Sequence, residues 1–600
     1  MKKKKIAITL STILSLTITS GVSSMTAHAE ENEGSSVKDK NVMLNGQISE
    51  GLMSNTKIEL ENGMTKPIYS LDEAIVENLF VETEVDSDRD RDGKKDRVSV
   101  KVMRPKTNSD VKVPVIYEMS PYRSGLKDVP VYNVDEELYA YEGKPYGAVN
   151  LGSYGNYYVP RGYAVILGES IGTGKSDGCP TTGDEQEILG TKSVIDWVNG
   201  RAKAYTEDGK EVNANWSSGN VGMTGVSYNG TLPNAVATTG VEGLKTIIPI
   251  AAISSWYDYY RANGAVIAPG GYQGEDTDNM AEAVLTRKNP EVCGQIIKEL
   301  TAGQDRKTGD YNDFWDKRNY VKDVKNVKAS VFVVHGLNDW NVKTKQFAQW
   351  WEALGKNNVP RKMWLHQGGH GGTSSNNWQQ TQNKWFDYWL YGIENGIMDE
   401  PMVDVQRENK SWQKIKNWPD PAAVPSKVRM YLSNKSVNLP LSMGSVNNVF
   451  SLVDDAKIQS NQLVENPELE IANRLVYTMP VLQKDMRISG TPKISITGNI
   501  DRSVSNLTAV LVDYGGAKPE IVTRGWMDPQ NLNSIENSTA IQPGKDYTFT
   551  WDMQPDDYVF KAGHQMGVVL IASDYDYTIR PKAGTKLTVK LSEVTLPIVK

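Results

Sequence analysis

The 600-residue chain contains 39% hydrophobic and 23% charged residues, values that are usual for soluble globular proteins. This composition excludes disordered, collagen-like and coiled-coil chains, and at roughly 150 residues per domain the length allows up to about four domains. The 66 basic and 73 acidic side chains give a formal net charge of −7. We therefore expect no extended basic surface for nucleic acid and no polyanionic substrate.

The N-terminus has the pattern of a secretory signal peptide. Residues 2–5 are all lysine, residues 6–22 form an apolar stretch, and Ala27-His28-Ala29 supplies a small-x-small cleavage site. We expect cleavage after Ala29, a secreted, extracellular protein and no membrane association of the mature chain. An uncleaved membrane anchor is the alternative, although the apolar stretch is short for a span of about 20 residues and contains Ser and Thr.

The next part of the chain changes from polar to strand-forming. Residues 30–80 form a polar N-terminal leader segment, with weak helical character near residues 71–79. Residues 81–253 alternate apolar runs rich in β-branched residues with glycine-rich turns and helical stretches, of which 185–198 is the longest. This alternation predicts βαβ units and a mainly parallel sheet, the first part of an α/β domain.

The second half predicts an insertion and then a different fold. Residues 254–328 are aromatic, charged and helix-leaning and separate two buried strands, so we expect an inserted helical cap. Residues 329–420 complete the α/β domain with a strand at 330–334 and a closing helix at 385–391. After a proline-rich linker, residues 427–600 show short alternating strands with turn signals, which are typical of a β-sandwich.

Two cysteines, Cys179 and Cys293, are too few for a disulfide scaffold or a cysteine-rich metal site. The sequence leaves open whether they pair or lie free and buried.

Gly225-Val226-Ser227-Tyr228-Asn229-Gly230 follows an apolar run and precedes a predicted helix. A strand, a tight turn with serine and a helix are the parts of a nucleophile elbow, in which the serine hydroxyl is exposed above the sheet. The alternative is a glycine-rich turn that carries an incidental serine, because the usual second glycine arrives one residue late.

Two further loops carry an acid and histidines. Asp339 follows the strand at 330–334, where a carboxylate can orient an imidazole, although an aspartate that caps the next helix would look the same. The glycine-rich loop at 365–372 carries His366 and His370. We favour His370 as the base, because His366 directly follows apolar residues. The order Ser227, Asp339, His370 is that of the α/β-hydrolase triad.

These motifs resemble those of the Xaa-Pro dipeptidyl-peptidases of serine peptidase family S15 and of their relatives, the cocaine-esterase-like and α-amino-acid ester hydrolases. The resemblance rests on Gly-x-Ser-Tyr-x-Gly at 225–230, Ser-Ser-Trp-Tyr-Asp-Tyr-Tyr at 254–260, His-Gly-Leu-Asn-Asp-Trp-Asn at 335–341 and Leu-His-Gln-Gly-Gly-His at 365–370. It spans roughly residues 80–600. It implies an α/β-hydrolase domain with an inserted helical cap, followed by an all-β, galactose-binding-like jelly roll.

The resemblance also implies the roles of individual residues. Ser227, Asp339 and His370 would form the catalytic triad of a secreted exopeptidase that releases N-terminal Xaa-Pro dipeptides through an acyl-enzyme. The hydroxyl of Tyr122 and the backbone N–H of Tyr228 would stabilise the oxyanion.

Specificity for proline requires a compact apolar pocket and recognition of a free N-terminus. We expect Trp256 and Tyr259 to form the proline pocket, although aromatic core packing is the alternative. Glu275 is the candidate that pairs with the substrate ammonium group, and Asn341 is the candidate that binds the carbonyl of the preceding residue. The expected partners are therefore proline-containing peptides with a free N-terminus, and a homodimer is compatible with the sequence.

The segment at 88–96 places carboxylates at positions 1, 3, 5 and 9 of an EF-hand-like loop with Gly93 at position 6. Ser99 stands at position 12 in place of glutamate, so we favour a solvated turn and expect neither a metal nor a cofactor.

Two alternatives to the exopeptidase remain. One is an esterase of the cocaine-esterase or α-amino-acid ester hydrolase type. The other is a carbohydrate-binding surface protein with a vestigial hydrolase domain.

Overall fold

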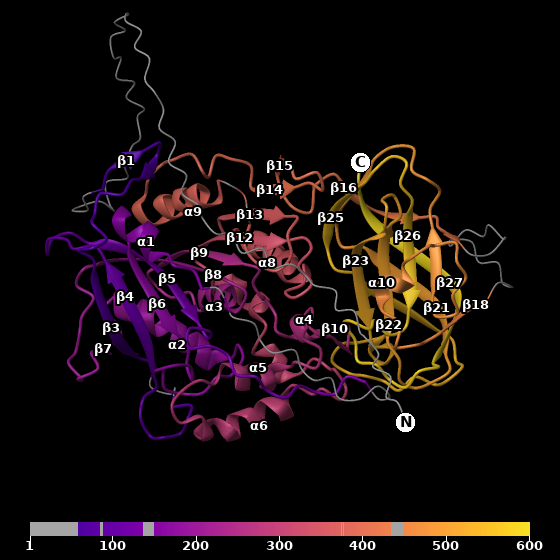
Figure 1. Cartoon of the computed structure of the whole chain (residues 1–600), viewed down its shortest axis with the longest axis horizontal. Coiled ribbons are helices and arrows are strands. Elements are labelled where there is room, and N and C mark those ends of the chain that lie inside the picture. Colours follow the sequence, from indigo (N-terminus) through magenta and orange to yellow (C-terminus); the bar gives the residue numbers. More distant parts are fainter. Residues whose placement is uncertain are drawn as a thin grey trace, which may run out of the picture. The chain divides into compact units, whose positions relative to one another are not determined.

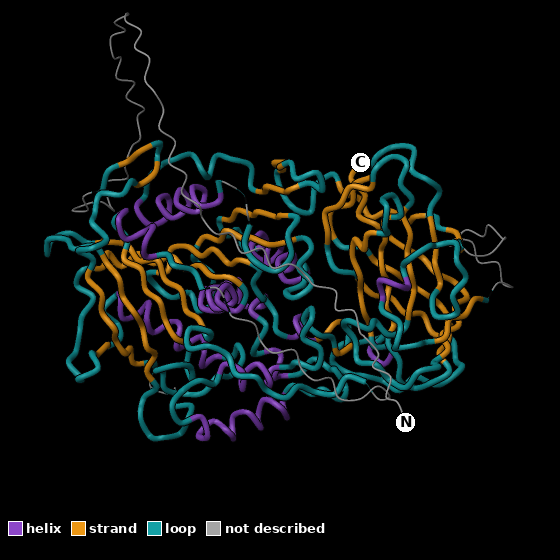
Figure 2. The backbone as a smooth tube through the Cα atoms, in the orientation of Figure 1, coloured by secondary structure: helices purple, strands orange, loops and turns teal. Residues whose placement is uncertain are grey.

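The computed structural model describes residues 58–84, 88–135, 149, 151–373, 375, 377–433 and 449–600. The predicted signal peptide and most of the predicted leader lie outside these residues. The described residues form an α/β part followed by an all-β part (Figure 1), and strands and helices alternate along the chain in the first and not in the second (Figure 2). In the described part of the chain, we find no helix with the length and apolar character needed to cross a bilayer.

An eleven-stranded sheet forms the centre of the α/β domain. Its strands are β3 (Ile75–Glu82), β4 (Arg97–Arg104), β5 (Val113–Ser120), β6 (Ala164–Glu169), β7 (Ala204–Tyr205), β8 (Ser217–Val226), β9 (Leu244–Ile250), β12 (Ser330–Gly336), β13 (Arg361–His366), β14 (Val403–Gln406) and β15 (Trp412–Ile415). The strand order is β15-β14-β13-β12-β9-β8-β5-β6-β4-β3-β7. All neighbours from β14 to β6 are parallel, and the pairs toward both edges are antiparallel. The predicted mainly parallel sheet is confirmed.

The start of this domain differs from the sequence prediction. Residues 75–82 form strand β3 and pair along their whole length with β4, so the expected helical character near residues 71–79 was wrong, and the sheet begins before residue 81. Val76 is exposed while Leu79 and Val81 are buried, because β3 has one face toward the core and one toward solvent. A small hairpin, β1 (Leu60–Glu61) with β2 (Met64–Thr65), precedes it.

Helices cover both faces of the sheet: α2 (Glu185–Val198), α3 (Tyr228–Ala237) and α8 (Lys345–Lys356) on one face, and α1 (Gly155–Tyr158) and α9 (Trp378–Phe386) on the other (Figure 1). Alternate side chains of a central strand enter the two apolar clusters that result. In β5, Val115 and Tyr117 pack with the first group of helices and Ile116 with the second. A π-helical turn, Asp387–Tyr391, continues α9, so the predicted closing helix is present but begins at Trp378, before the predicted residue 385.

Residues 251–329 form an insertion between β9 and β12, which are neighbours in the sheet. The insertion contains α4 (Tyr257–Tyr260), the short hairpin β10 (Arg261–Ala262) and β11 (Ala265–Val266), α5 (Thr277–Val284), the 3-10 turn η2 (Pro290–Cys293), α6 (Gly294–Gly303), α7 (Asp313–Asp316) and the 3-10 turn η3 (Tyr320–Asn326).

The all-β domain consists of two sheets. One contains β16 (Ala423–Val428), β18 (Phe450–Val453), β20 (Met486–Gly490), β21 (Lys493–Ile500), β24 (Tyr547–Asp552), β25 (Asp556–Phe560) and β27 (Lys586–Val599); the other contains β17 (Tyr431–Leu432), β19 (Leu475–Thr478), β22 (Leu507–Asp513), β23 (Glu520–Met527) and β26 (Met566–Ile571). Side chains from both sheets share one apolar cluster, which is the core of a β-sandwich. Because β16 pairs with β27 from Ala423 onward, the domain begins before residue 427, within the predicted linker.

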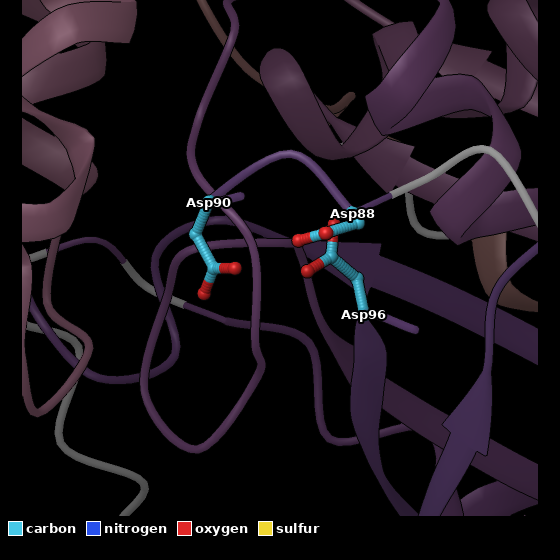
Figure 3. Close-up of side chains that lie close together, drawn as sticks. All are labelled: Asp88, Asp90 and Asp96. Carbon is cyan, nitrogen blue, oxygen red and sulfur yellow. The ribbon is translucent and has the colours of Figure 1, made fainter. Parts of the chain in front are cut away.

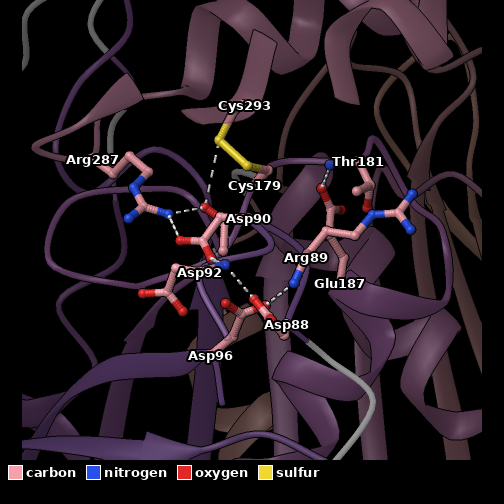
Figure 4. Close-up of a disulfide and its surroundings, with 11 residues drawn as sticks. Asp88, Arg89, Asp90, Asp92, Asp96, Cys179, Thr181, Glu187, Arg287 and Cys293 are labelled. Atoms are coloured by element: carbon pink, nitrogen blue, oxygen red, sulfur yellow. Dashed lines mark hydrogen bonds and ion pairs between the residues drawn. A yellow bond between two sulfur atoms is a disulfide. The ribbon is translucent and has the colours of Figure 1, made fainter. Parts of the chain in front are cut away.

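The two cysteines form a disulfide, which ties the segment after β6 to η2 of the insertion (Figure 4). Arg287 lies beside it and donates to both the carboxylate of Asp90 (2.5 Å) and the backbone oxygen of Gly178 (2.6 Å). The disulfide closes a loop of 114 residues, which is long enough to restrict the unfolded chain substantially.

We expect the double variant Cys179→Ser/Cys293→Ser to lower the free energy of unfolding by about 3–5 kcal/mol, because the unfolded chain regains the entropy of that loop. Scanning calorimetry of wild type and variant measures the loss. Reductant should destabilise the wild type and leave the variant unchanged. Identical unfolding of the two proteins under oxidising conditions would contradict a stabilising disulfide.

Candidate active site

Ser227 lies at the tight turn between β8 and α3. Its backbone has φ 62° and ψ −126°, a conformation that is strained for a residue with a side chain and typical of a nucleophile elbow. A Cβ atom on Gly230 would lie 2.7 Å from the backbone oxygen of Gly225 and 2.9 Å from that of Ile250. Close packing of the turn therefore requires the glycine at 230, which explains its displaced position in the motif.

Asp339 and His370 are hydrogen-bonded at the ends of neighbouring strands. Nδ1 of His370 donates to Oδ2 of Asp339 over 2.9 Å, from the loop that follows β13 to the loop that follows β12. The Asp339 side chain is fully buried, whereas that of His370 is 30% exposed. This bond fixes the tautomer and orientation of the ring and leaves Nε2 of His370 to accept a proton.

The loop at 339–343, which we call the acid loop, holds the aspartate with its own backbone. Oδ1 of Asp339 accepts from the N–H groups of Asn341 (3.0 Å) and Val342 (2.9 Å). Nε2 of His335 donates to the carbonyl of Val342 over 2.8 Å, and burial lowers the pKa of His335. His335 is therefore a neutral side chain that supports the acid loop.

His366, the alternative base, does not face the aspartate in this way. Its Nδ1 accepts from the backbone N–H of Gly368, and it is 5% exposed. Burial lowers its pKa to about 4, so it stays neutral at ordinary pH and orients the glycine-rich loop.

A cavity of about 490 Å³ opens above Ser227 and His370. It is lined by Glu118, Tyr122, Leu126, Val149, Gly152, Tyr154, Val226, Ser227, Asn229, Tyr259, Tyr272, Glu275, Met280, Asn341, His370 and Gly371. Ser227, the nucleophile candidate, and His370, the base candidate, therefore line the same cavity. Its lining is partly apolar and partly polar, as is usual for sites that bind small molecules and peptides.

One oxyanion candidate shares the cavity with Ser227, and the other follows Ser227 in the chain. Tyr122 lines the cavity, and burial followed by the charge of Glu275 raises the pKa of its hydroxyl, which therefore remains a donor. Tyr228 is the first residue of α3, where backbone N–H groups have no acceptor in a preceding turn. Its side chain points elsewhere and donates to Glu187 over 2.6 Å.

The expected proline pocket is present only in part. Tyr259 lines the cavity, and its hydroxyl donates to Oδ1 of Asn341 over 3.0 Å, so the amide NH₂ of Asn341 remains available as a donor. Trp256 is not among the described residues that line the cavity. It is buried behind Tyr259, edge to face at 5.7 Å, and donates to Tyr320, so the packing alternative holds for this tryptophan.

Among the described residues, two carboxylates line the cavity, and only Glu275 is predicted from the sequence. Glu275 is 2% exposed and accepts from the hydroxyl of Tyr260 over 2.8 Å. Glu118, which we missed, lies on β5 and pairs with Arg123; burial raises its pKa while Arg123 opposes that shift. An acid within the otherwise apolar run at 113–119 was the signal that identifies it.

The acidic turn at 88–96 lies apart from this cavity. Asp88, Asp90 and Asp96 each place a carboxylate oxygen within 4.8 Å of the others (Figure 3). Asp88 accepts from the backbone of the turn, Asp90 from Arg287 and Asp96 from the N–H of Arg89, so each has a protein partner. Burial raises the pKa of Asp96 to about 7.

The fold and the site together define a hydrolase of the α/β type. Residues 92–372 match the family described as X-Pro dipeptidyl-peptidase (S15 family), and residues 395–599 match its C-terminal non-catalytic domain. A Bacillus anthracis protein provisionally named as an Xaa-Pro dipeptidyl-peptidase is 90% identical over 600 residues and 100% of both chains. The Xaa-Pro dipeptidyl-peptidase of Lacticaseibacillus rhamnosus is 32% identical, over 90% of this chain and 78% of that protein. The chain therefore belongs to the S15 family of Xaa-Pro dipeptidyl-peptidases.

Solved structures support the same fold at low sequence identity. A CocE/NonD family hydrolase from Staphylococcus aureus covers 92% of this chain and 100% of its own, with TM-score 0.63 and 16% identity. An α-amino acid ester hydrolase covers 89% of this chain and 98% of its own, with TM-score 0.62 and 15% identity. At these identities the likeness concerns the fold alone.

The two histidines of the glycine-rich loop provide a matched pair of variants. We expect His370→Ala to lower kcat by about 10⁴-fold or more, because the proton acceptor beside Ser227 is lost. We expect His366→Ala to lower kcat by no more than about 10-fold, since only loop orientation changes. Steady-state hydrolysis of a chromogenic Ala-Pro amide measures both, and the reverse ranking would assign the base to His366.

Proposed function

We propose that this protein is an exported serine exopeptidase that releases Xaa-Pro dipeptides from peptide N-termini through an acyl-enzyme on Ser227. The observation that carries the proposal is the buried Asp339 hydrogen-bonded to His370, with His370 and Ser227 lining one cavity. The pattern of residues 1–29, which lie outside the described part of the chain, supports export. We further propose that the insertion acts as a cap over the site and that the all-β domain is a jelly roll.

In the proposed reaction, the hydroxyl oxygen of Ser227 attacks the carbonyl carbon of the substrate proline while His370 accepts the hydroxyl proton. Asp339 stabilises the imidazolium that forms. The Tyr122 hydroxyl and the Tyr228 N–H donate to the oxyanion, and loss of one such donor typically costs about 10²–10³-fold in rate. His370 then protonates the leaving amine, and water attacks the resulting ester in a second passage through the same steps.

Recognition of the dipeptide rests on groups that surround the nucleophile. The ring of Tyr259 provides an apolar wall for proline, and the amide NH₂ of Asn341, oriented by Tyr259, donates to the carbonyl of the residue before proline. Glu275 pairs with the substrate ammonium group. Its burial supports this role, because a desolvated carboxylate attracts a cation more strongly than one in water.

The test compares free and blocked amines on the same dipeptide. We expect N-acetylated Ala-Pro amides to be cleaved very poorly, because acetylation removes the charge that pairs with Glu275. We expect Glu275→Gln to weaken kcat/KM for the free-amine substrate by about 2–5 kcal/mol and to leave a small neutral ester much less affected. Parallel kinetics on the amide and the ester measure the difference.

Glu282→Gln is the matched control, because Glu282 lies on α5 of the same insertion and is not among the described residues that line the cavity. It should retain both activities. Undiminished cleavage of N-acetylated amides by the wild type would contradict the exopeptidase and favour the esterase. Equal loss of both activities in Glu275→Gln would contradict its role as the ammonium anchor.

A further inference from the structure

The acid loop is held from outside as well as by its own backbone. The N–H of Gly270, in the insertion, donates to the carbonyl of Trp340 over 2.9 Å. The Nζ atom of Lys343 donates to the carbonyl of Ala268, two residues earlier in the insertion, over 2.8 Å. The insertion segment is in turn bonded to the all-β domain, since the N–H of Ala268 donates to the carbonyl of Tyr577 over 2.7 Å.

Side chains of the all-β domain contact the partly buried ring of Trp340 directly. Its ring lies 6.5 Å from Trp526, edge to face, and 6.0 Å from Tyr577. The guanidinium group of Arg524 lies 4.9 Å from the ring centre of Trp340 and 4.8 Å from that of Tyr577, within the range of cation–π attraction.

A buried acid fixes this arrangement. Asp574 is fully buried and accepts from both Arg524 (3.0 Å) and the indole N–H of Trp526 (3.0 Å). Because one carboxylate orients the guanidinium and the indole together, the surface that receives Trp340 is preorganised.

The other end of the acid loop enters the same cluster. Lys343 is 1% exposed, and its Nζ atom lies 6.0 Å from the ring centre of Tyr259, 5.8 Å from that of Trp526 and 5.9 Å from that of Tyr577. No described ion pair includes Lys343. Its described contacts are these aromatic faces and one carbonyl, and the charges of Asp339 and Glu275 also act on it.

We propose that Arg524, Trp526 and Tyr577 are positioning residues for the hydrolytic reaction. They fix Trp340 and Lys343. They thereby hold Asp339, which directly precedes Trp340, and Asn341, which lies between the two anchors, in register with His370 and the substrate. Trp340 is covalently next to Asp339, so a displacement of one moves the other, and misplacement of a catalytic group by about 1 Å can cost 10²-fold in rate. The inference rests on the proposed function only in assigning Asp339 to the triad.

The test uses two variants. Trp340→Ala removes the indole ring that contacts Arg524, Trp526 and Tyr577. Arg524→Lys keeps the positive charge beside Asp574 but removes the planar guanidinium group that lies on the ring of Trp340. Arg487→Lys is the matched control. Arg487 is a partly buried arginine of the same domain, paired with Asp557 and Asp420 and without a described contact to the acid loop.

Three quantities are compared in these variants: the melting temperature, kcat and KM for an Ala-Pro amide, and the rate at which a fluorophosphonate labels Ser227. The labelling rate reports nucleophile activation independently of any peptide. We expect labelling and kcat to fall together, by about 100-fold in Trp340→Ala and about 10-fold in Arg524→Lys, while KM changes by less than about threefold. Trp340→Phe should recover most of the loss, and Arg487→Lys should match the wild type.

The proposal would be overturned if Trp340→Ala and Arg524→Lys kept the wild-type labelling rate and the wild-type kcat. It would also be overturned if Arg487→Lys lost as much kcat as Arg524→Lys, because a general effect of the all-β domain on stability would then explain both losses. If the wild type is labelled but does not cleave Ala-Pro amides, the proposed function fails. The dependence of labelling on Trp340 and Arg524 still supports the inference in that case.

Discussion

The hydrogen bond from His370 to the buried carboxylate of Asp339 is the contact on which the proposed active site depends. A carboxylate removed from water is costly unless it is fully hydrogen-bonded. Here two backbone N–H groups of the acid loop and the imidazole of His370 supply those bonds. Since the loop must take a particular shape to present both N–H groups, the position of the acid and the conformation of residues 339–342 are determined together.

The sheet brings these parts together because its central strands are parallel. The elbow after β8, the acid loop after β12 and the glycine-rich loop after β13 all follow the carboxyl ends of strands, at one edge of the sheet. This is where α/β folds bind their ligands. The insertion between β9 and β12 adds Tyr259 and Glu275 to the lining of the same cavity without altering the order of the strands.

The sequence predicted the parts of the molecule whose signals are local. Helix α2 coincides with the helical stretch predicted at 185–198, and β5 coincides with a nearly continuous apolar run. Ser227, Asp339 and His370 each lie in a short motif whose residue types have a physical reason. Strand β3 was mistaken for a helix because only its long pairing with β4 defines it. The disulfide, the orientation of Trp256 and the pairing of Glu118 with Arg123 depend on contacts between distant segments or on side-chain direction, which no local pattern contains. The aromatic cluster around Trp340 joins residues nearly 240 positions apart for the same reason.

The most direct measurement of the central claim is the mass of the peptide that contains Ser227, taken from enzyme quenched in acid during turnover of an Ala-Pro ester. Our account predicts an alanyl-prolyl group on Ser227 that appears before free dipeptide accumulates and disappears when substrate is exhausted. In Asp339→Asn, which removes the charge that stabilises the imidazolium, the adduct should form far more slowly. Unmodified Ser227 during undiminished turnover, or the dipeptidyl group on another residue, would contradict the account.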